Sequence, residues 1–210
     1  MCREGILFVL SGPSGAGKGT VLQEVLTRLD NIAVSVSVTT RAPRAGEIDG
    51  LHYHFRTHNE FAQMIENGEF LEYVTKFKNR YGTPKSQVEQ LLASGKDVIL
   101  EIETNGATQV RKVFPRAVLI FVTPTNPDEL GKRLDKRGSE TAESKALRLK
   151  IAQRELKCIK YYSYIAINDD LAECTNTTEA IIRAERCRLS RNPELKDKYV
   201  NYLKNKQPKE

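Results

Sequence analysis

The chain has 210 residues, 40% of them hydrophobic, and a formal net charge of +6 at pH 7. A chain of this size and composition can bury the core of one domain with subdomains. No apolar run approaches the roughly 20 residues that a membrane-spanning helix needs, and the N-terminal segment is not typical of a secretory signal. The four cysteines show neither CxxC spacing nor a neighbouring histidine cluster, which argues against a zinc site or a disulfide framework. We therefore expect a cytoplasmic protein with reduced thiols and no membrane partner.

Most of the positive charge lies near the C-terminus. Residues 181–210 contain nine Lys or Arg residues and four Asp or Glu residues, a balance of +5. A basic segment of this kind is compatible with nucleic-acid binding, but we identify no aromatic stacking platform beside the charges. We therefore interpret the tail as a solvated helix end and do not expect a nucleic-acid partner. The oligomeric state stays open.

Apolar runs alternate with amphipathic segments along most of the chain, which is the pattern of an α/β fold with a mostly parallel sheet. Short continuous apolar runs predict buried strands at residues 6–11, 97–103, 117–123 and 163–169. Apolar positions at helical spacing predict helices at residues 19–29, 60–68, 86–96 and 128–137. The segment 35–85 instead alternates and is rich in turn residues, so we interpret it as a small mixed insertion that could hold a second substrate.

The first predicted strand runs directly into a glycine-rich turn. Residues 12–18, GPSGAGK, fit the GxxxxGK pattern between a strand and a helix. Glycines allow backbone N–H groups to converge on phosphate oxygens, the following helix adds its N-terminal dipole, and Lys18 supplies a cation for the β- and γ-phosphates. The alternative is a glycine turn with a lysine there by chance, which the strand and helix context disfavours.

One position departs from this phosphate-binding pattern. The motif expects Ser or Thr directly after the lysine, but this chain has Gly19 and then Thr20. The hydroxyl that would bind Mg²⁺ is therefore displaced by one residue. Several nucleoside monophosphate kinases have GKGT here, so the departure narrows the class of enzyme without abolishing the site.

The insertion carries side chains suited to a phosphate and a polar base. Arg41 and Arg44 lie three residues apart after a run of hydroxyl residues, and arginine matches the oxygens of a phosphate monoester bidentately. Further along stand Glu72, Tyr81 and Thr83. By itself Glu72 would be interpreted as a solvated strand carboxylate.

Taken together, these segments resemble the guanylate kinase family. The matching blocks are SGPSGAGKGT, SVTTRAPRAGEIDGLHYHF, NGEFLEY, NRYGT, GKDVILEIETNGA, KRGSET and INDDL. They stand in the order of the family and cover about residues 4–185. The resemblance implies an enzyme that transfers the γ-phosphoryl of ATP to GMP, and also to dGMP, with Mg²⁺ as cofactor.

The resemblance also implies a division of the chain. A P-loop core with a parallel sheet would comprise residues 1–34 and 96–190, with a helical lid at about 132–150. Residues 35–95 would form the GMP-binding insertion, and residues 191–210 the basic tail.

The family's site residues transfer to matching positions of this sequence. ATP would be bound by Gly12, Pro13, Ser14, Gly15, Ala16, Gly17, Lys18, Gly19, Thr20, Asn168 and Asp169. GMP would be bound by Ser37, Arg41, Arg44, Tyr53, Glu72, Tyr81, Thr83, Glu101 and Glu103. The catalytic cations would be Lys18, Arg44, Arg137 and Arg148, the last two from the lid. Thr20 and Glu101 would hold Mg²⁺, directly or through water.

The chemistry of the base agrees with this assignment independently. Guanine has donors at N1 and N2, so it needs a carboxylate acceptor such as Glu72, and its O6 needs a donor such as a hydroxyl. Adenine lacks the N1 donor and would leave a buried carboxylate unpaired, and polar pairing of this kind can discriminate by about 10⁴-fold or more.

Two positions differ from the usual family pattern. The family has aspartate where this chain has Glu101 and Glu103, and each glutamate reaches one methylene further. Acids at the end of a strand beside a P-loop hold Mg²⁺ through water or fix a guanidinium, but ion pairing within the fold is an equal alternative for this pair.

Two other functions use related sequences. Guanylate-kinase-like interaction modules bind protein partners, but they tend to lack P-loop or substrate-clamp residues that this chain keeps. A P-loop kinase for another phosphorylated substrate, such as a ribose bisphosphate, would not need the guanine-reading set of Ser37, Glu72 and Thr83.

Overall fold

The computed structural model describes residues 3–76, 78–135, 151 and 153–206. Within this part of the chain, five parallel strands form one sheet in the order β2-β7-β1-β8-β9. These strands are β1 (Leu7–Ser11), β2 (Ile32–Val34), β7 (Asp97–Glu101), β8 (Val118–Thr123) and β9 (Tyr164–Ile167). All of them end at the same edge of the sheet, and parallel α/β sheets bind ligands at that edge.

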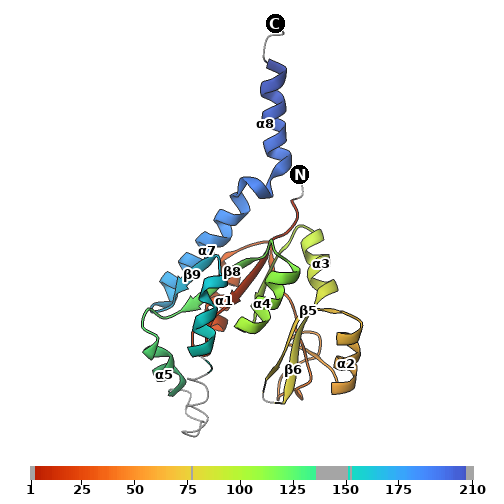
Figure 1. Ribbon diagram of the computed structural model, residues 1–210, viewed down its shortest axis with the longest axis vertical. Helices are drawn as coiled ribbons and strands as arrows, with labels where there is room; N and C mark the ends of the chain where they lie inside the picture. Colours follow the sequence, from red (N-terminus) through yellow and green to blue (C-terminus); the bar gives the residue numbers. More distant parts are fainter. Residues whose placement is uncertain (1–2, 77, 136–150, 152, 207–210) are drawn as a thin grey trace.

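Helices cover both faces of this sheet (Figure 1). They are α1 (Lys18–Arg28), α3 (Lys85–Ala93), α4 (Thr104–Val113), α5 (Asp128–Asp135) and α7 (Leu171–Cys187), with a 3₁₀ turn η1 at Lys157–Tyr161. The central strand β1 is buried on both faces: Phe8 and Leu10 join a core with α1 and α7, whereas Leu7 and Val9 join a core with α3 and α4. No helix in the described part of the chain is long and apolar enough to cross a membrane.

The predicted α/β fold, with a parallel sheet flanked by helices, is confirmed. The predicted strands correspond to β1, β7, β8 and β9, although β7 ends at Glu101 rather than at 103. The helix expected at 128–137 is described as far as Asp135, and its last two positions lie outside the described residues. Helix α4 was not predicted, because its sequence TNGATQVRKV opens with threonine, asparagine and glycine, which are poor helix formers.

A second, smaller sheet lies beside the first one (Figure 1). Its strand order is β4-β3-β6-β5, with β3 parallel to β4 and antiparallel to β6. The elements are β3 (Val38–Thr39), β4 (His54–Phe55), β5 (Phe70–Lys76), β6 (Asn79–Pro84) and the covering helix α2 (His58–Glu66). A capping box between Thr57 and Glu60 starts α2. The second sheet therefore arises within the segment that the sequence marked as a mixed insertion.

The C-terminal helix α8 (Pro193–Lys206) follows the 3₁₀ turn η2 (Leu189–Arg191) and projects away from the body (Figure 1). Glu185 anchors this junction: its buried carboxylate accepts hydrogen bonds from Tyr164 Oη at 2.6 Å and Arg191 Nε at 2.9 Å. On α8 itself Tyr199 and Tyr202 are 64% and 59% exposed. Two exposed aromatic side chains therefore lie on the basic tail, and the absence of a nucleic-acid partner stays a prediction.

Asp97 ties the N-terminal segment and the last core helix to the sheet. Its fully buried carboxylate accepts hydrogen bonds from the Ile6 N–H at 2.8 Å, Arg3 Nη2 at 2.8 Å and Arg186 Nε at 2.7 Å. Burial opposes ionisation of this carboxyl, but the hydrogen bonds from Arg3, Ile6 and Arg186 outweigh it and hold the pKa of Asp97 below its ordinary value.

We expect Asp97→Asn to lower the free energy of unfolding at pH 7 by about 2–3 kcal/mol, since hydrogen bonds to a charged group are lost from a buried position. Because the folded-state pKa of Asp97 is depressed, its stabilising contribution is present above the unfolded pKa of about 4 and is lost as pH falls through the folded value. Urea unfolding at pH 7 and pH 3 measures both effects, and the gap between wild type and variant should shrink at pH 3. The control is Glu179→Gln, which removes the helical pair with Arg183 and should change stability by less than about 0.5 kcal/mol.

Candidate active site

The phosphate-binding turn joins β1 to α1 at the carboxyl edge of the large sheet. Gly17, the residue before α1, has φ 84°, a conformation that side chains disfavour. A Cβ at Gly17 would also lie 2.4 Å from Asn168 Nδ2. Glycine is therefore required at this position both by the backbone angle and by the approach of a neighbouring loop.

Asn168 and Asp169 follow β9 and support the turn from the side. Asn168 Nδ2 donates a hydrogen bond to the Ala16 carbonyl at 2.6 Å, and Asp169 Oδ1 accepts one from the Thr125 N–H at 3.0 Å. The predicted contact of both residues with adenine stays a prediction. What they do in the structure is to fix the phosphate-binding turn and the loop after β8.

Lys18 is half-buried beside the turn that it belongs to. Its Nζ donates hydrogen bonds to the carbonyls of Gly12 at 2.7 Å and Pro13 at 3.1 Å. Burial lowers the pKa of Lys18, and the negative charges of Glu155 and Glu101 act against that shift. The lysine is thus an internal cation with acidic groups around it.

Glu101 ends β7 and lies against the start of α1. A Cβ at position 19 would lie 3.4 Å from both carboxylate oxygens of Glu101. Burial raises the pKa of Glu101, and the nearby Lys18 opposes this. The two departures from the usual motifs, Gly19 and Glu101, therefore lie next to each other in space.

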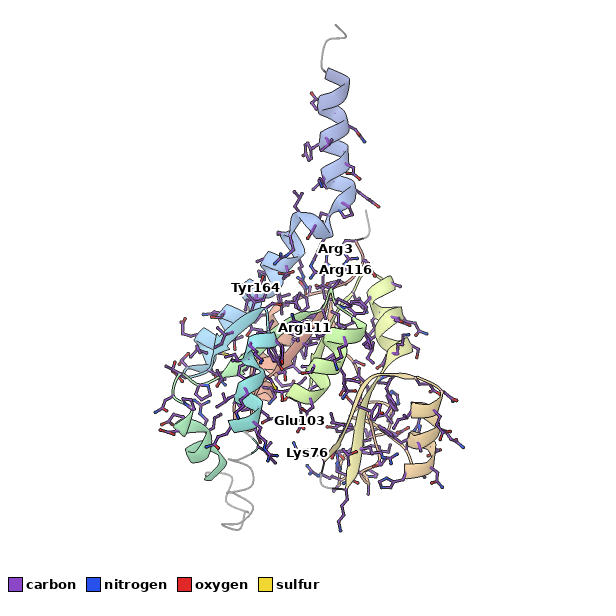
Figure 2. All side chains as sticks on the ribbon, in the orientation of Figure 1. Arg3, Lys76, Glu103, Arg111, Arg116 and Tyr164 are labelled. Carbon is purple, nitrogen blue, oxygen red and sulfur yellow. The ribbon has the colours of Figure 1, made fainter. Side chains whose placement is uncertain are left out.

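Glu103 caps the start of α4 and pairs with a residue of the second sheet. Its carboxylate forms an ion pair with Lys76 Nζ of β5. Figure 2 shows both side chains in the region between the two sheets. The ion-pair alternative considered for this acid is therefore present in the structure, and it connects the insertion to the core.

Glu155 is a site residue that sequence reasoning missed. Its Oε2 accepts a hydrogen bond from the Ser14 N–H at 3.1 Å, and the residue is only 8% exposed. Burial raises the pKa of Glu155, while the Ser14 hydrogen bond and the Lys18 charge oppose this. A carboxylate thus lies at a backbone N–H of the phosphate-binding turn. A lone glutamate in a basic helical segment gave no signal of this placement.

Glu72 and Thr83 form a buried polar pair on adjacent strands. They are register partners of β5 and β6, and Thr83 Oγ1 donates a hydrogen bond to Glu72 Oε1 at 2.7 Å. The two residues are 4% and 0% exposed. Burial raises the pKa of Glu72 to about 7, against the opposing hydrogen bond from Thr83.

The predicted phosphate clamp comes from β6 and from the loop between β3 and β4. The guanidinium of Arg41 lies 5.4 Å from the ring centre of Tyr53 and pairs with Glu47 at 2.8 Å. The rings of Tyr53 and Tyr81 meet edge to face at 6.2 Å. Arg41 is therefore occupied by an internal carboxylate in this state of the protein.

One cavity of about 880 Å³ brings the two halves of the predicted site together. From the core it is lined by Ser14, Gly15, Gly17, Lys18, Gly19, Thr20, Gln23, Glu24, Glu101, Ile102, Glu103 and Glu155. From the insertion it is lined by Ser37, Arg44, Tyr53, Glu72, Val74, Lys76 and Tyr81.

The remaining predicted residues do not line this cavity or cannot be placed. Arg41 and Thr83 contact lining residues, and Asn168 holds the turn from behind. Arg137 and Arg148 lie outside the described residues. Within the described part of the chain, no three His, Cys, Asp or Glu side chains are grouped to hold a metal ion.

Comparison of the chain with known proteins identifies its family. The guanylate kinase family model matches residues 4–185. This chain belongs to the guanylate kinase family. It is 50% identical to guanylate kinase from Desulfitobacterium hafniense (strain Y51) over 191 residues, which are 91% of this chain and 96% of that protein. It is 48% identical to guanylate kinase from Clostridium perfringens (strain SM101 / Type A) over 90% of this chain and 88% of that protein.

A solved structure agrees with the sequence comparison. The crystal structure of guanylate kinase from Anaplasma phagocytophilum superposes with a TM-score of 0.73 at 34% identity, covering 90% of each chain. The resemblance identified from the sequence motifs is therefore confirmed.

The raised pKa of Glu72 predicts an unusual effect of Glu72→Gln on stability. A carboxyl whose folded pKa is about 7 contributes stability below its unfolded pKa of about 4.3, and this contribution is lost as pH rises through 7. We therefore expect Glu72→Gln, which cannot ionise, to melt about 2–4 °C higher than wild type at pH 8, a shift equivalent to about 1 kcal/mol for a chain of this size. Thermal melts at pH 8 and at about pH 3.5 test this, and the difference should nearly vanish at the lower pH, where the carboxyl is protonated in both the folded and the unfolded state. Equal melting temperatures at pH 8 would contradict the buried, proton-binding state of Glu72.

Proposed function

We propose that this protein is a nucleoside monophosphate kinase that transfers the γ-phosphoryl group of ATP to GMP. The observation that carries the proposal is the single cavity in which a phosphate-binding turn faces a buried Glu72–Thr83 pair. The turn suits a nucleoside triphosphate, and the acidic pair suits the donor edge of guanine. Membership of the family supports the same assignment.

Recognition of the base rests on hydrogen-bond polarity. Glu72 Oε1 already accepts from Thr83, so its remaining lone pairs can accept from N1–H and N2–H of guanine. Ser37 lines the same cavity and can contact the remaining polar edge of the base. The contacts proposed here are all with the base, and we extend the proposal to dGMP on that ground.

Basic and phenolic side chains of the insertion would bind the GMP phosphate. Arg44, Tyr53 and Tyr81 line the cavity, while the Arg41 guanidinium packs over Tyr53. Arg41 would turn from Glu47, whose side chain is 19% exposed, to the phosphate.

Transfer itself needs positioned cations rather than a covalent intermediate. A GMP phosphate oxygen bonds to the γ-phosphorus while the bond from that phosphorus to the β–γ bridging oxygen breaks and ADP leaves. The transition state spreads negative charge over the equatorial oxygens. Lys18 would neutralise part of this charge once it leaves the Gly12 and Pro13 carbonyls. By resemblance to the family, Arg137 and Arg148 of the lid would supply the other cations.

The donor set fits a magnesium ion that arrives with ATP. Magnesium is commonly bound by one or two protein oxygens together with phosphates and water, so a preformed cluster of three acids is not needed. Thr20 and Glu101 line the cavity beside Lys18 and would hold the ion, directly or through water. When bound, the ion would offset the charge on the transferring phosphates.

We also propose the division of the chain that the family resemblance implies. Residues 1–34 and 96–190 would act as the ATP-binding core, and residues 35–95 as the GMP-binding insertion. We place the enzyme in the cytoplasm, where ATP and GMP are available, with a role in recycling GMP.

The test of the proposed function is a coupled assay of ATP consumption with GMP, AMP, CMP and UMP, using wild type and Glu72→Gln. We expect wild type to prefer GMP. In Glu72→Gln the kcat/KM for GMP should fall about a hundredfold or more, because hydrogen bonds to a charged group are worth about 1.5–3 kcal/mol each. The kcat/KM for AMP and the KM for ATP should stay unchanged. Equal losses for GMP and AMP would show that Glu72 does not select the base.

Replacing Lys18 tests the phosphate-binding turn separately. We expect Lys18→Ala to reduce kcat for GMP phosphorylation by about 10²–10³-fold, the usual effect of removing one group that stabilises transition-state charge. The matched control is Lys112→Ala, an exposed lysine at the end of α4, which should leave kcat unchanged. Circular dichroism confirms that both variants fold. A folded Lys18→Ala protein with near-normal turnover would refute the role of the turn.

A further inference from the structure

Gly106 is the third residue of α4, a position where glycine has no local justification. It is not among the residues with positive φ, so the backbone would accept alanine. Glycine inside a helix is about 1 kcal/mol less favourable than alanine. A reason for the glycine must therefore come from what lies next to it in space.

The neighbour of Gly106 is the carboxylate of Glu72. A Cβ built on Gly106 would lie 2.3 Å from Glu72 Oε2 and 3.0 Å from its Cδ. On its other side the same carboxylate is held by Thr83, which donates to Oε1 at 2.7 Å. The carboxylate therefore fits between a hydroxyl and a bare backbone carbon.

Helix α4 cannot easily move away to make room for a side chain. Gln109, three residues after Gly106, is hydrogen-bonded to both backbone groups of Tyr73, the residue after Glu72. Gln109 Nε2 donates to the Tyr73 carbonyl at 2.9 Å, and Gln109 Oε1 accepts from the Tyr73 N–H at 3.2 Å. These bonds hold α4 at a fixed distance from β5 beside the carboxylate.

We propose that Gly106 is a positioning residue for base specificity: its missing side chain provides the space in which the Glu72 carboxylate faces the GMP cavity. The inference rests on the proposed function, since it concerns how that site reads guanine. An alanine at this position would displace Oε2, break the alignment with Thr83, and turn the carboxylate away from the N1 and N2 donors of the base.

The kinetic test combines Gly106→Ala with Glu72→Asp, which withdraws the carboxylate by one methylene. In Gly106→Ala we expect kcat/KM for GMP to fall about tenfold or more, since small misplacements of positioned groups are costly, while KM for ATP stays within about twofold of wild type. Glu72→Asp should reduce GMP activity in the wild-type background but raise it in the Gly106→Ala background, and this opposite sign is the expected signature of direct coupling. A GMP activity of Gly106→Ala within about twofold of wild type, or a loss that Glu72→Asp does not relieve, would overturn the inference.

A stability cycle tests the same contact without relying on activity. In urea unfolding, Gly106→Ala should destabilise wild type but stabilise a Glu72→Ala background, where the space is free and the helix propensity of alanine is expressed. The same sign in both backgrounds would overturn the inference. Failure of the proposed function looks different, because wild type itself would then show no preference for GMP.

Discussion

The ammonium group of the half-buried Lys18 donates hydrogen bonds to carbonyl groups of its own turn, 2.7 Å from Gly12 O and 3.1 Å from Pro13 O. Burial lowers its pKa, and the carboxylates of Glu155 and Glu101 oppose this shift. Nucleotide phosphates carry the same sign of charge as these carboxylates. We propose that ATP binding moves Lys18 off the carbonyls and releases the Ser14 N–H from Glu155. This redistribution favours a nucleotide that brings its own divalent cation, because the added positive charge lets the acidic side chains stay ionised beside phosphate.

The two sheets place this charge cluster opposite the base-reading pair. Parallel strands bring the phosphate-binding turn and Glu101 to one edge of the large sheet, and the second sheet presents Glu72 to the same cavity. Two polar links hold β5 to the region around α4, namely the Lys76–Glu103 ion pair (Figure 2) and the bonds of Gln109 to the Tyr73 backbone. Phosphate binding and base recognition are thus connected through α4, which belongs to the core by packing and contacts β5.

Local pattern was enough to predict the parts of the site that lie together in sequence. The turn from Gly12 to Lys18 and the strand before it follow from spacing and apolar character, and Glu72 with Thr83 followed from the family blocks. Contacts that join distant segments could not be predicted. Glu155 stands 141 residues from Ser14, and the clash that requires glycine at position 106 exists only because β5 lies against α4. The exposure of Tyr199 and Tyr202 could not be predicted either, because it depends on α8 projecting away from the body.

Glu72 and Gly106, the residues proposed to position and read guanine, both depart from the usual residue preferences of their positions. Each departure lowers the stability of the fold. A carboxylate is buried to 4% exposure, where burial raises its pKa to about 7, and a glycine occupies a helix position at which alanine is intrinsically better. Sites at which local preference and structure disagree are commonly functional. The two departures also explain each other. The glycine is needed only if the carboxylate is there, and the free-energy cost of burying the carboxylate is offset only if a ligand with two hydrogen-bond donors occupies the cavity. Selection for stability alone would remove both at once, by replacing Glu72 with a neutral residue and Gly106 with alanine. Their joint presence is therefore a stronger argument for a guanine ligand than either residue alone.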